Sequence, residues 1–226
     1  MSERLIILPF NTELGVARLE ELGRGIIASF DEYYSSVKVL EPCIATPEDF
    51  PDPSEFTDYM HDSPETINEK KARRVFSKDT VLGTYTTLNG NPGESLYKIL
   101  ADELGSTHAL VVTDMLINFG GYKAGGVADR QLGKVTVTTH SIRGYSNSKN
   151  NDELERRLVG VARHELGHIF GLEHHDALLS DGKYCPMVNR AWDDPEFETP
   201  EGIAAYMDSR GERFCGNCIE TIGSFK

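Results

Sequence analysis

The sequence predicts an α/β fold, in which a mainly parallel sheet packs against helices. The chain has 226 residues, enough for one large domain, and 39 % of them are hydrophobic, which is typical of a folded globular protein. The first forty residues have the pattern of a strand, a helix and a second strand, and such patterns alternate further along the chain. Alternation of this kind favours parallel strands that are connected by helices.

The first strand-helix-strand unit follows from the periodicity of apolar residues. Residues 5–8 form a short apolar run, as expected of a buried strand, and Val37–Leu40 forms another. Between them, Asn11 or Thr12 can cap the start of a helix. The apolar positions of this helix recur close to helical spacing: Leu14, Leu19, Leu22, Ile26 and Ile27.

The net charge of −13 is concentrated in one segment of the chain. Residues 41–69 contain nine carboxylates, five prolines and no Lys or Arg, so they contribute −9 and leave −4 for the rest. We expect residues 41–78 to form an acidic, proline-rich insertion. Strong acidity does not suit phosphate binding, so we expect no nucleic acid partner. No run approaches the roughly 20 apolar residues of a bilayer-spanning helix, so we expect no membrane partner either.

Four further segments lead to the part of the chain that carries chemistry. We predict a helix over residues 94–104, a buried strand over Ala109–Thr113 and then a glycine-rich loop. Residues 134–139 alternate valine with polar residues, which predicts a half-exposed or edge strand. A long helix begins after a polar loop that ends near Asn151. Its apolar residues share one side: Leu154, Leu158, Val161 and Leu166.

The long helix contains the pattern His-Glu-x-x-His-x-x-Gly-x-x-His, which begins at His164. Because His164 and His168 are four residues apart, both imidazoles face the same side and can reach one metal ion. Glu165 lies beside that side, where it can accept a proton without ligating the metal. His174 would lie about 15 Å from His164 along a continuous helix. A chain reversal is therefore needed, and Gly171 is suited to provide it.

Three imidazoles leave a fourth position for water, which is the open geometry of a catalytic zinc site. We expect His164, His168 and His174 to bind zinc, and Glu165 to act as general base toward the zinc-bound water. The reaction class is hydrolysis of an amide bond. The pattern is that of the metzincins, whose companion is a methionine turn beneath the metal, and Met187 is the candidate for it.

A second metal site is predicted downstream. Cys185, Cys215 and Cys218 can form a closed, tetrahedral Cys₃His zinc site with His175. The alternatives to His175 are Asp176, a water or no fourth ligand. The alternatives for Cys215 and Cys218 are ordinary small hydrophobic residues or a redox pair. The N-terminal apolar stretch is too short for a signal peptide, so we expect a cytoplasmic protein with reduced thiols.

At these residues the sequence resembles the archaemetzincins, in which a cysteine follows the third histidine, then Cys-x-Met, then Cys-x-x-Cys. Residues 185–187 and 215–218 match this pattern, whereas His175 replaces the first cysteine and the intervals are longer. The resemblance covers mainly residues 105–218. It implies a metzincin-like twisted mixed sheet, mainly parallel with an antiparallel edge strand, packed on helices that include the active-site helix. It also implies a small zinc-stapled C-terminal subdomain at residues 172–226, with one catalytic and one structural zinc.

We therefore expect a single metzincin-like catalytic domain over residues 1–226, acting as a monomeric zinc metallopeptidase on peptide or protein substrates. The resemblance also implies an edge strand that pairs with an extended substrate, which we assign to residues 134–139. It further implies aminopeptidase-like action on short peptides or amino-terminal residues. The alternative is a zinc-binding structural or regulatory protein with little or no peptidase activity, in which the acidic segment is a docking surface.

Overall fold

The computed structural model of the protein describes residues 3–10, 12–30, 33–42, 108–114, 117–119, 122–130, 133–139, 142–143, 146, 148–189 and 199–225. The expected acidic insertion lies outside the described residues, apart from Glu41 and Pro42, and so does the helix expected at residues 94–104. The candidate metal ligands are all described.

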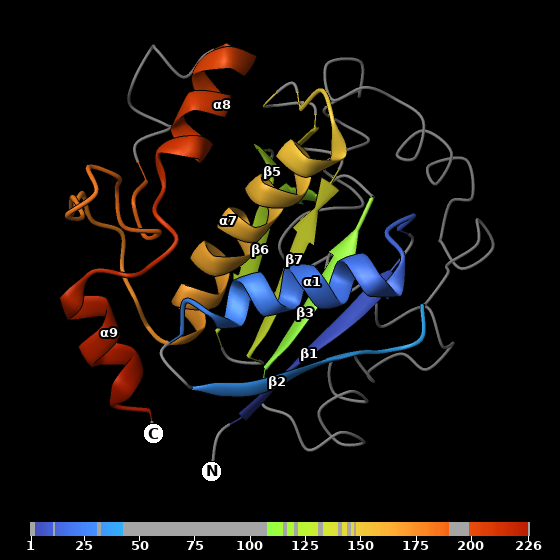
Figure 1. Ribbon diagram of the computed structural model, residues 1–226, viewed down its shortest axis with the longest axis horizontal. Coiled ribbons are helices and arrows are strands. Elements are labelled where there is room, and N and C mark those ends of the chain that lie inside the picture. Colours follow the sequence, from blue (N-terminus) through green and yellow to red (C-terminus); the bar gives the residue numbers. More distant parts are fainter. Residues whose placement is uncertain are drawn as a thin grey trace.

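A five-stranded mixed sheet forms the centre of the fold, with the strand order β2-β1-β3-β7-β6 (Figure 1). The first four strands in this order are parallel to their neighbours, and β6 is antiparallel to β7. The predicted sheet, mainly parallel with an antiparallel edge strand, is therefore confirmed. The strands are β1 (Glu3–Phe10), β2 (Tyr34–Val39), β3 (Ala109–Thr113), β6 (Gly126–Asp129) and β7 (Lys134–Thr138).

The edge strand, however, is not the one that we expected. Residues 134–138 form β7, which has β3 on one side and β6 on the other. Val135 and Val137 are fully buried, and Thr136 between them is 2 % exposed. The alternation of valine with threonine resembles a half-exposed strand, but threonine is β-branched and can also be buried in a sheet. The assignment of the substrate-pairing edge to residues 134–139 is therefore wrong, and β6 is the antiparallel edge strand.

A short hairpin precedes β6. Its strands are β4 (Ile117–Phe119) and β5 (Tyr122–Ala124), which pair antiparallel. The glycines in this region predicted only a loop, because strands of three residues are too short to show a hydrophobic period.

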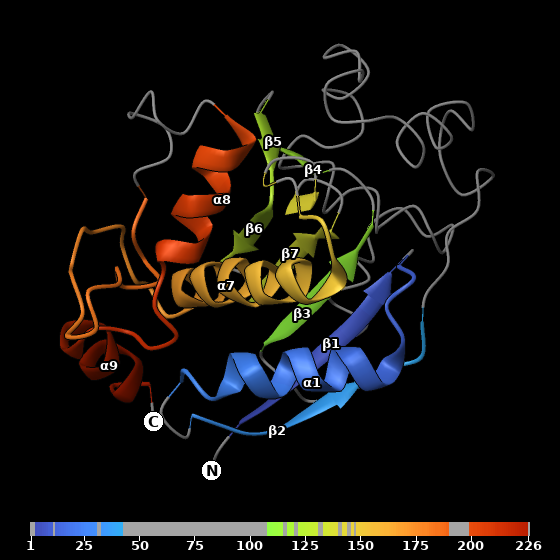
Figure 2. The ribbon, with the colours of Figure 1, turned by 45° about the horizontal axis from the view of Figure 1, so that its top comes forward.

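Two helices cover the same face of the sheet, as both views of the ribbon show (Figures 1 and 2). They are α1 (Val16–Ile27) and α7 (Asn151–Ile169). The α1 helix starts after Gly15, later than the predicted cap. Thr12 instead donates a hydrogen bond of 3.1 Å to Asp114, which follows β3. On α7, the Asn150 side chain caps the helix by accepting a hydrogen bond from the third residue of the first turn, as polar N-caps do.

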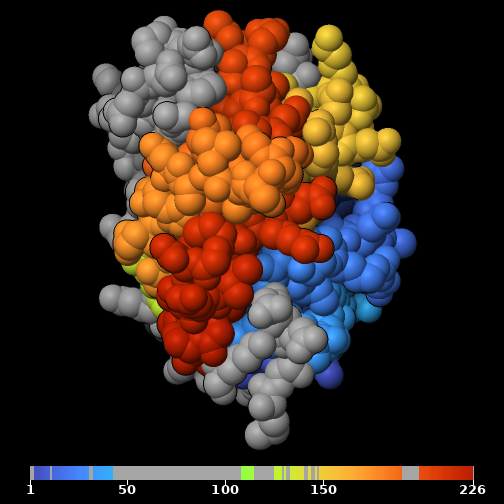
Figure 3. Space-filling model, turned by 60° about the vertical axis from the view of Figure 1, so that its left-hand side comes forward, coloured from blue at the N-terminus to red at the C-terminus, as the bar shows by residue number. Residues whose placement is uncertain are grey.

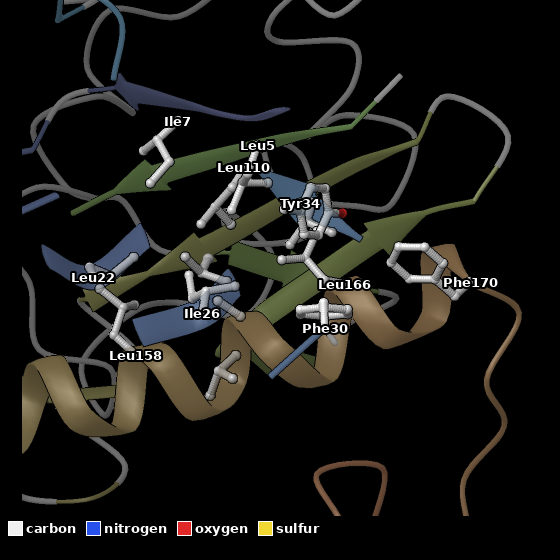
Figure 4. Packing of buried hydrophobic residues seen from close by; sticks show 14 of the residues in the cluster. Leu5, Ile7, Leu22, Ile26, Phe30, Tyr34, Leu110, Leu158, Leu166 and Phe170 are labelled. Carbon is white, nitrogen blue, oxygen red and sulfur yellow. The ribbon is translucent and has the colours of Figure 1, made fainter. Parts of the chain in front are cut away.

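The core lies between the sheet and these two helices (Figure 4). The predicted apolar side of α7 is buried there, with Leu154, Leu158 and Leu166 each at most 1 % exposed. Burial of a side chain of this size contributes roughly 1.5–3 kcal/mol to folding. The core thereby fixes α7, and with it the two histidines near its C-terminal end. The other members of the core shown around α7 are Leu5, Ile7, Leu22, Ile26, Phe30, Tyr34, Leu110 and Phe170.

Two shorter helices follow the metal-binding motif, namely α8 (Pro200–Ser209) and α9 (Gly216–Gly223). Neither was predicted, although Thr199 before Pro200 is a recognisable helix start, and the Thr199 side chain does cap α8. No helix in the described parts of the chain is both long and apolar enough to cross a membrane.

Candidate metal centres

The end of α7 and the turn that follows it bring three histidines together. His164 and His168 lie one turn apart on α7, and the chain reverses directly after the helix. Gly171 stands in this reversal with φ of +72°, a conformation in which residues with a side chain are strained. The turn returns His174 to the two helical histidines, as predicted.

The three imidazoles, called here the three-histidine cluster, have the geometry of a metal site. Their ligand nitrogens all lie within 4.8 Å of one another, and Nε2 of His164 is 3.3 Å from Nε2 of His174. Two nitrogens bound to zinc at the tetrahedral angle are separated by about 3.3 Å. The three-histidine cluster therefore fits zinc.

Backbone carbonyls orient the two helical histidines. Nδ1 of His164 donates to the carbonyl oxygen of Pro186 at 2.8 Å, and Nδ1 of His168 donates to that of Leu172 at 2.9 Å. A carbonyl oxygen can only accept a hydrogen bond, so the hydrogen of each neutral ring is on Nδ1 and Nε2 is left free for metal. Burial lowers the pKa of both histidines, which favours the neutral form that metal binding needs.

The third histidine is oriented by a side chain. Nδ1 of His174 lies 3.3 Å from the amide nitrogen of Asn189. With this amide turned so that its oxygen faces the ring, Nδ1 can donate to it and Nε2 is free for metal. Partial burial lowers the pKa of His174 too. Leu172, Pro186 and Asn189 all belong to residues 172–189, called here the ligand loop. Each of the three imidazoles therefore has its outer partner in this one loop.

Glu165 lies against the edge strand. A Cβ atom placed on Gly126 of β6 would be 2.7 Å from Cγ of Glu165 and 2.9 Å from Cγ1 of Val161, so only glycine allows this contact. Burial raises the pKa of Glu165 from 4.5 to about 7, against the opposing effect of the Arg210 charge. A carboxylate with a pKa near neutrality can both accept and return a proton.

Met187 lies beneath the three-histidine cluster. Its side chain is fully buried, and its sulfur occupies the position that a Cβ on Gly167 would need. Gly167 lies on α7 just before His168, so the contact places Met187 under the helical ligands. This is the position that the methionine-turn interpretation expects.

The second group of predicted ligands also converges, and we call it the Cys/His cluster. It consists of His175, Cys185, Cys215 and Cys218, whose ligand atoms all lie within 4.8 Å of one another. The sulfurs of Cys185 and Cys218 are 3.9 Å apart, and Nε2 of His175 is 3.4 and 3.7 Å from those of Cys215 and Cys218. Tetrahedral zinc separates two sulfurs by about 3.8 Å and a sulfur from a nitrogen by about 3.6 Å. The Cys/His cluster therefore fits zinc as well.

One cysteine of the cluster, Cys185, favours the thiolate form. Hydrogen bonding from the Cys218 thiol lowers the pKa of Cys185 to about 5, and the same interaction raises that of Cys218. Nδ1 of His175 lies 3.1 Å from the carbonyl oxygen of Glu173, so its Nε2 is left to face the sulfurs. Thiolate is the form of cysteine that binds metal.

Two residues near the centres had no sequence signal of their own. Gly126 was hidden in a glycine-rich loop. Arg130 follows β6 and donates to the Glu173 carboxylate at 3.0 Å and to the Leu172 carbonyl at 3.5 Å. It also lies 3.2 Å from Nδ1 of His168. Arg130 therefore connects the edge strand to the ligand loop.

Comparison with known proteins connects the chain to zinc-dependent peptidases. No protein-family model matches the sequence. An archaemetzincin of Halobacterium salinarum is 29 % identical over 86 residues, which are 38 % of this chain and 40 % of that protein. An archaemetzincin of Thermococcus kodakarensis is 41 % identical over 51 residues, 22 % of this chain and 27 % of that protein. The chain thus spans about two fifths or less of the length of these curated relatives.

Two crystal structures have the same fold. A zinc-dependent peptidase from Methanocorpusculum labreanum has a TM-score of 0.55 and 19 % identity, covering 96 % of this chain and 99 % of its own. Archaemetzincin from Methanopyrus kandleri has a TM-score of 0.56 and 19 % identity. The match covers 99 % of this chain and 94 % of that protein. The resemblance that the motifs indicated is therefore confirmed, and at this identity the structures establish the fold.

Proposed function

We propose that the protein is a zinc-dependent peptidase of the archaemetzincin kind, with one catalytic and one structural zinc per chain. The observation that carries the proposal is the convergence of the His164, His168 and His174 imidazoles, with Glu165 next to His164 on the same helix. The names of its relatives and structural neighbours, archaemetzincin and zinc-dependent peptidase, support the same function.

The two clusters bind the metals, and Glu165 transfers the proton. The three-histidine cluster holds the catalytic zinc, and the Cys/His cluster holds the structural one. When bound, the catalytic zinc supplies a Lewis acid that polarises a peptide carbonyl and lowers the pKa of water. Glu165 accepts a proton from the attacking water and passes it to the leaving amine. Burial raises its pKa, which makes it a stronger base than an exposed glutamate.

The edge strand β6 is the proposed binding surface for the peptide. One side of β6 pairs with β7, and no strand pairs with its other side among the described residues. An extended peptide can add to such an edge through backbone hydrogen bonds. Because Gly126 of β6 contacts Glu165, a peptide bound along this strand lies next to the catalytic carboxylate.

A peptide library tests the function. Purified protein is incubated with peptides that have free or blocked amino termini, and the products are identified by mass spectrometry. We expect cleavage that a chelator abolishes and zinc restores, and cleavage confined to free amino termini would establish aminopeptidase action. A protein that retains both metals but cleaves no peptide would instead support the structural or regulatory alternative. The Cys/His cluster favours this alternative, because it fits a structural zinc.

Replacing Gly126 with alanine is expected to lower kcat by about 100-fold with unchanged metal content. The new methyl group meets Cγ of Glu165 within 3.0 Å, so the carboxylate must shift, and a misplacement of about 1 Å can cost this much in rate. Gly160→Ala is the matched control, because nothing lies within 4 Å of its Cβ position on α7. Equal loss of activity in both variants would contradict the role of the Gly126 contact.

A further inference from the structure

We propose that metal binding at the Cys/His cluster controls metal binding at the three-histidine cluster, through the ligand loop. The inference rests on the metal assignments of the proposed function but not on its hydrolytic chemistry. Three steps lead to it: the loop orients all three imidazoles, its residues alternate between the two clusters, and the Cys/His cluster fastens it to α9.

The first step is the dependence of the imidazoles on the ligand loop. The acceptors for His164 and His168 are the carbonyl oxygens of Pro186 and Leu172, and His174 is itself a loop residue. Outer hydrogen bonds of this kind set the orientation of a ligating imidazole, and losing one typically lowers metal affinity about 10- to 100-fold. A displaced ligand loop would disturb all three histidines together.

The second step is that neighbouring loop residues serve different clusters. His174 belongs to the three-histidine cluster, and His175, the next residue, belongs to the Cys/His cluster. Cys185 is a Cys/His ligand, and Pro186, the next residue, holds His164. The backbone nitrogen of His175 also donates to the Met187 carbonyl at 3.3 Å. The two clusters are therefore joined by a single peptide bond at two places, His174–His175 and Cys185–Pro186, and a displacement of one cluster displaces the other.

The third step concerns what holds the ligand loop in place. It lies on the surface between α8 and α9, where residues 172–189 are orange in Figure 3, and it contains no helix or extended strand. At its far end, Tyr206 and Arg210 donate to the Val188 carbonyl at 2.8 and 3.2 Å. Tyr184 exchanges backbone hydrogen bonds with Ser209 and Gly211 at 2.9 and 2.7 Å. His175 and Cys185 are connected to α9 through the sulfurs of Cys215 and Cys218.

Loss of the metal at the Cys/His cluster should therefore loosen the near part of the loop without unfolding the chain, because the contacts to Val188 remain. We expect the affinity of the three-histidine cluster for zinc to fall by about 10- to 100-fold. Coupling between two binding sites is reciprocal. Disabling the three-histidine cluster must then lower the affinity of the Cys/His cluster by the same factor.

Three variants test the coupling. His175→Ala removes one Cys/His ligand, His175→Cys replaces it with another zinc ligand, and Lys183→Ala changes an exposed loop residue outside both clusters. Zinc affinity at the three-histidine cluster is measured by chelator competition, and Co²⁺ spectra distinguish thiolate from imidazole sites. We expect weaker binding in His175→Ala only, with near-normal binding in His175→Cys and Lys183→Ala. Normal affinity in a folded His175→Ala variant that has lost its thiolate-bound metal would overturn the proposal.

Two further measurements keep the test decisive if His175→Ala does not fold. In apo wild-type protein titrated with Co²⁺, occupation of the thiolate site, followed by its charge-transfer absorption, should raise the affinity of the imidazole site above that expected for independent sites. The variant His168→Ala should bind metal at its Cys/His cluster more weakly, by the factor found in the other direction. Independent filling of the two sites, or an unchanged Cys/His affinity in His168→Ala, would refute the coupling. All of these readouts are metal affinities, so they stand apart from whether the protein cleaves peptides.

Discussion

Replacing Glu165 with glutamine is expected to lower kcat by about 10²- to 10⁴-fold, the usual contribution of a general base, while both metals stay bound. Glutamine has nearly the shape of glutamate, so the contact with Gly126 is kept, but its amide cannot accept a proton from water. The expected result is thus a folded, metal-loaded protein without turnover. Peptide hydrolysis and metal content are measured on the same preparation.

The control for this change is Glu155→Gln. Glu155 is another partly buried carboxylate of α7, whose partner is Arg18 at 2.8 Å. Its replacement should leave kcat close to that of the wild type. If Glu165→Gln hydrolyses peptides as fast as the wild type, Glu165 is not the general base and the mechanism is wrong.

Replacing Arg157 with leucine is expected to lower the free energy of unfolding by about 3 kcal/mol, as is typical when one partner of a buried ion pair is removed. The Arg157 side chain is 7 % exposed and donates to both carboxylate oxygens of Asp208 at 3.0 and 2.8 Å. It also donates to the Ser146 carbonyl and the Ser148 hydroxyl. The change removes the more buried of the two ion pairs that connect α7 to Asp208 of α8. Denaturant unfolding measures the loss.

Arg156→Leu is a closely matched control for this prediction. Arg156 is the neighbouring residue and contacts the same carboxylate at 3.3 Å, but its side chain is 57 % exposed. Exposed ion pairs contribute little, roughly 0–1 kcal/mol, so Arg156→Leu should be nearly neutral. A similar loss in both variants would show that burial does not determine the value of the Arg157 pair.

The candidate sites could be predicted from the sequence because their ligands obey simple geometry. The four-residue spacing of His164 and His168 places both on one helix face, and Gly171 supplies the reversal that a third ligand requires. His175 follows from the need for a fourth zinc ligand near three cysteines. Their positions in the structure match the predicted clusters, and whether each residue binds zinc stays a prediction for the experiments above.

Other parts of the fold depend on long-range pairing, which local sequence patterns do not reveal. Residues 126–129 look like part of a glycine-rich loop and become a strand only because β7 is available to pair with them. Conversely, residues 134–138 look like an edge strand, and only their pairing with β6 puts them inside the sheet. The acceptors at Leu172 and Pro186 are backbone atoms, which every residue possesses, so no residue type could have marked them.

Glycine is required at the Gly171 reversal because of the backbone conformation there. Nothing lies within 4 Å of the position where its Cβ would be, yet its φ is +72°. There is room for a methyl group, so the constraint comes from the handedness of the backbone rather than from crowding. D-alanine, whose preferred φ is positive, suits this position, whereas L-alanine of the same volume is strained there. The convergence of the three histidines thus depends on one position where the chain needs the mirror image of an ordinary residue.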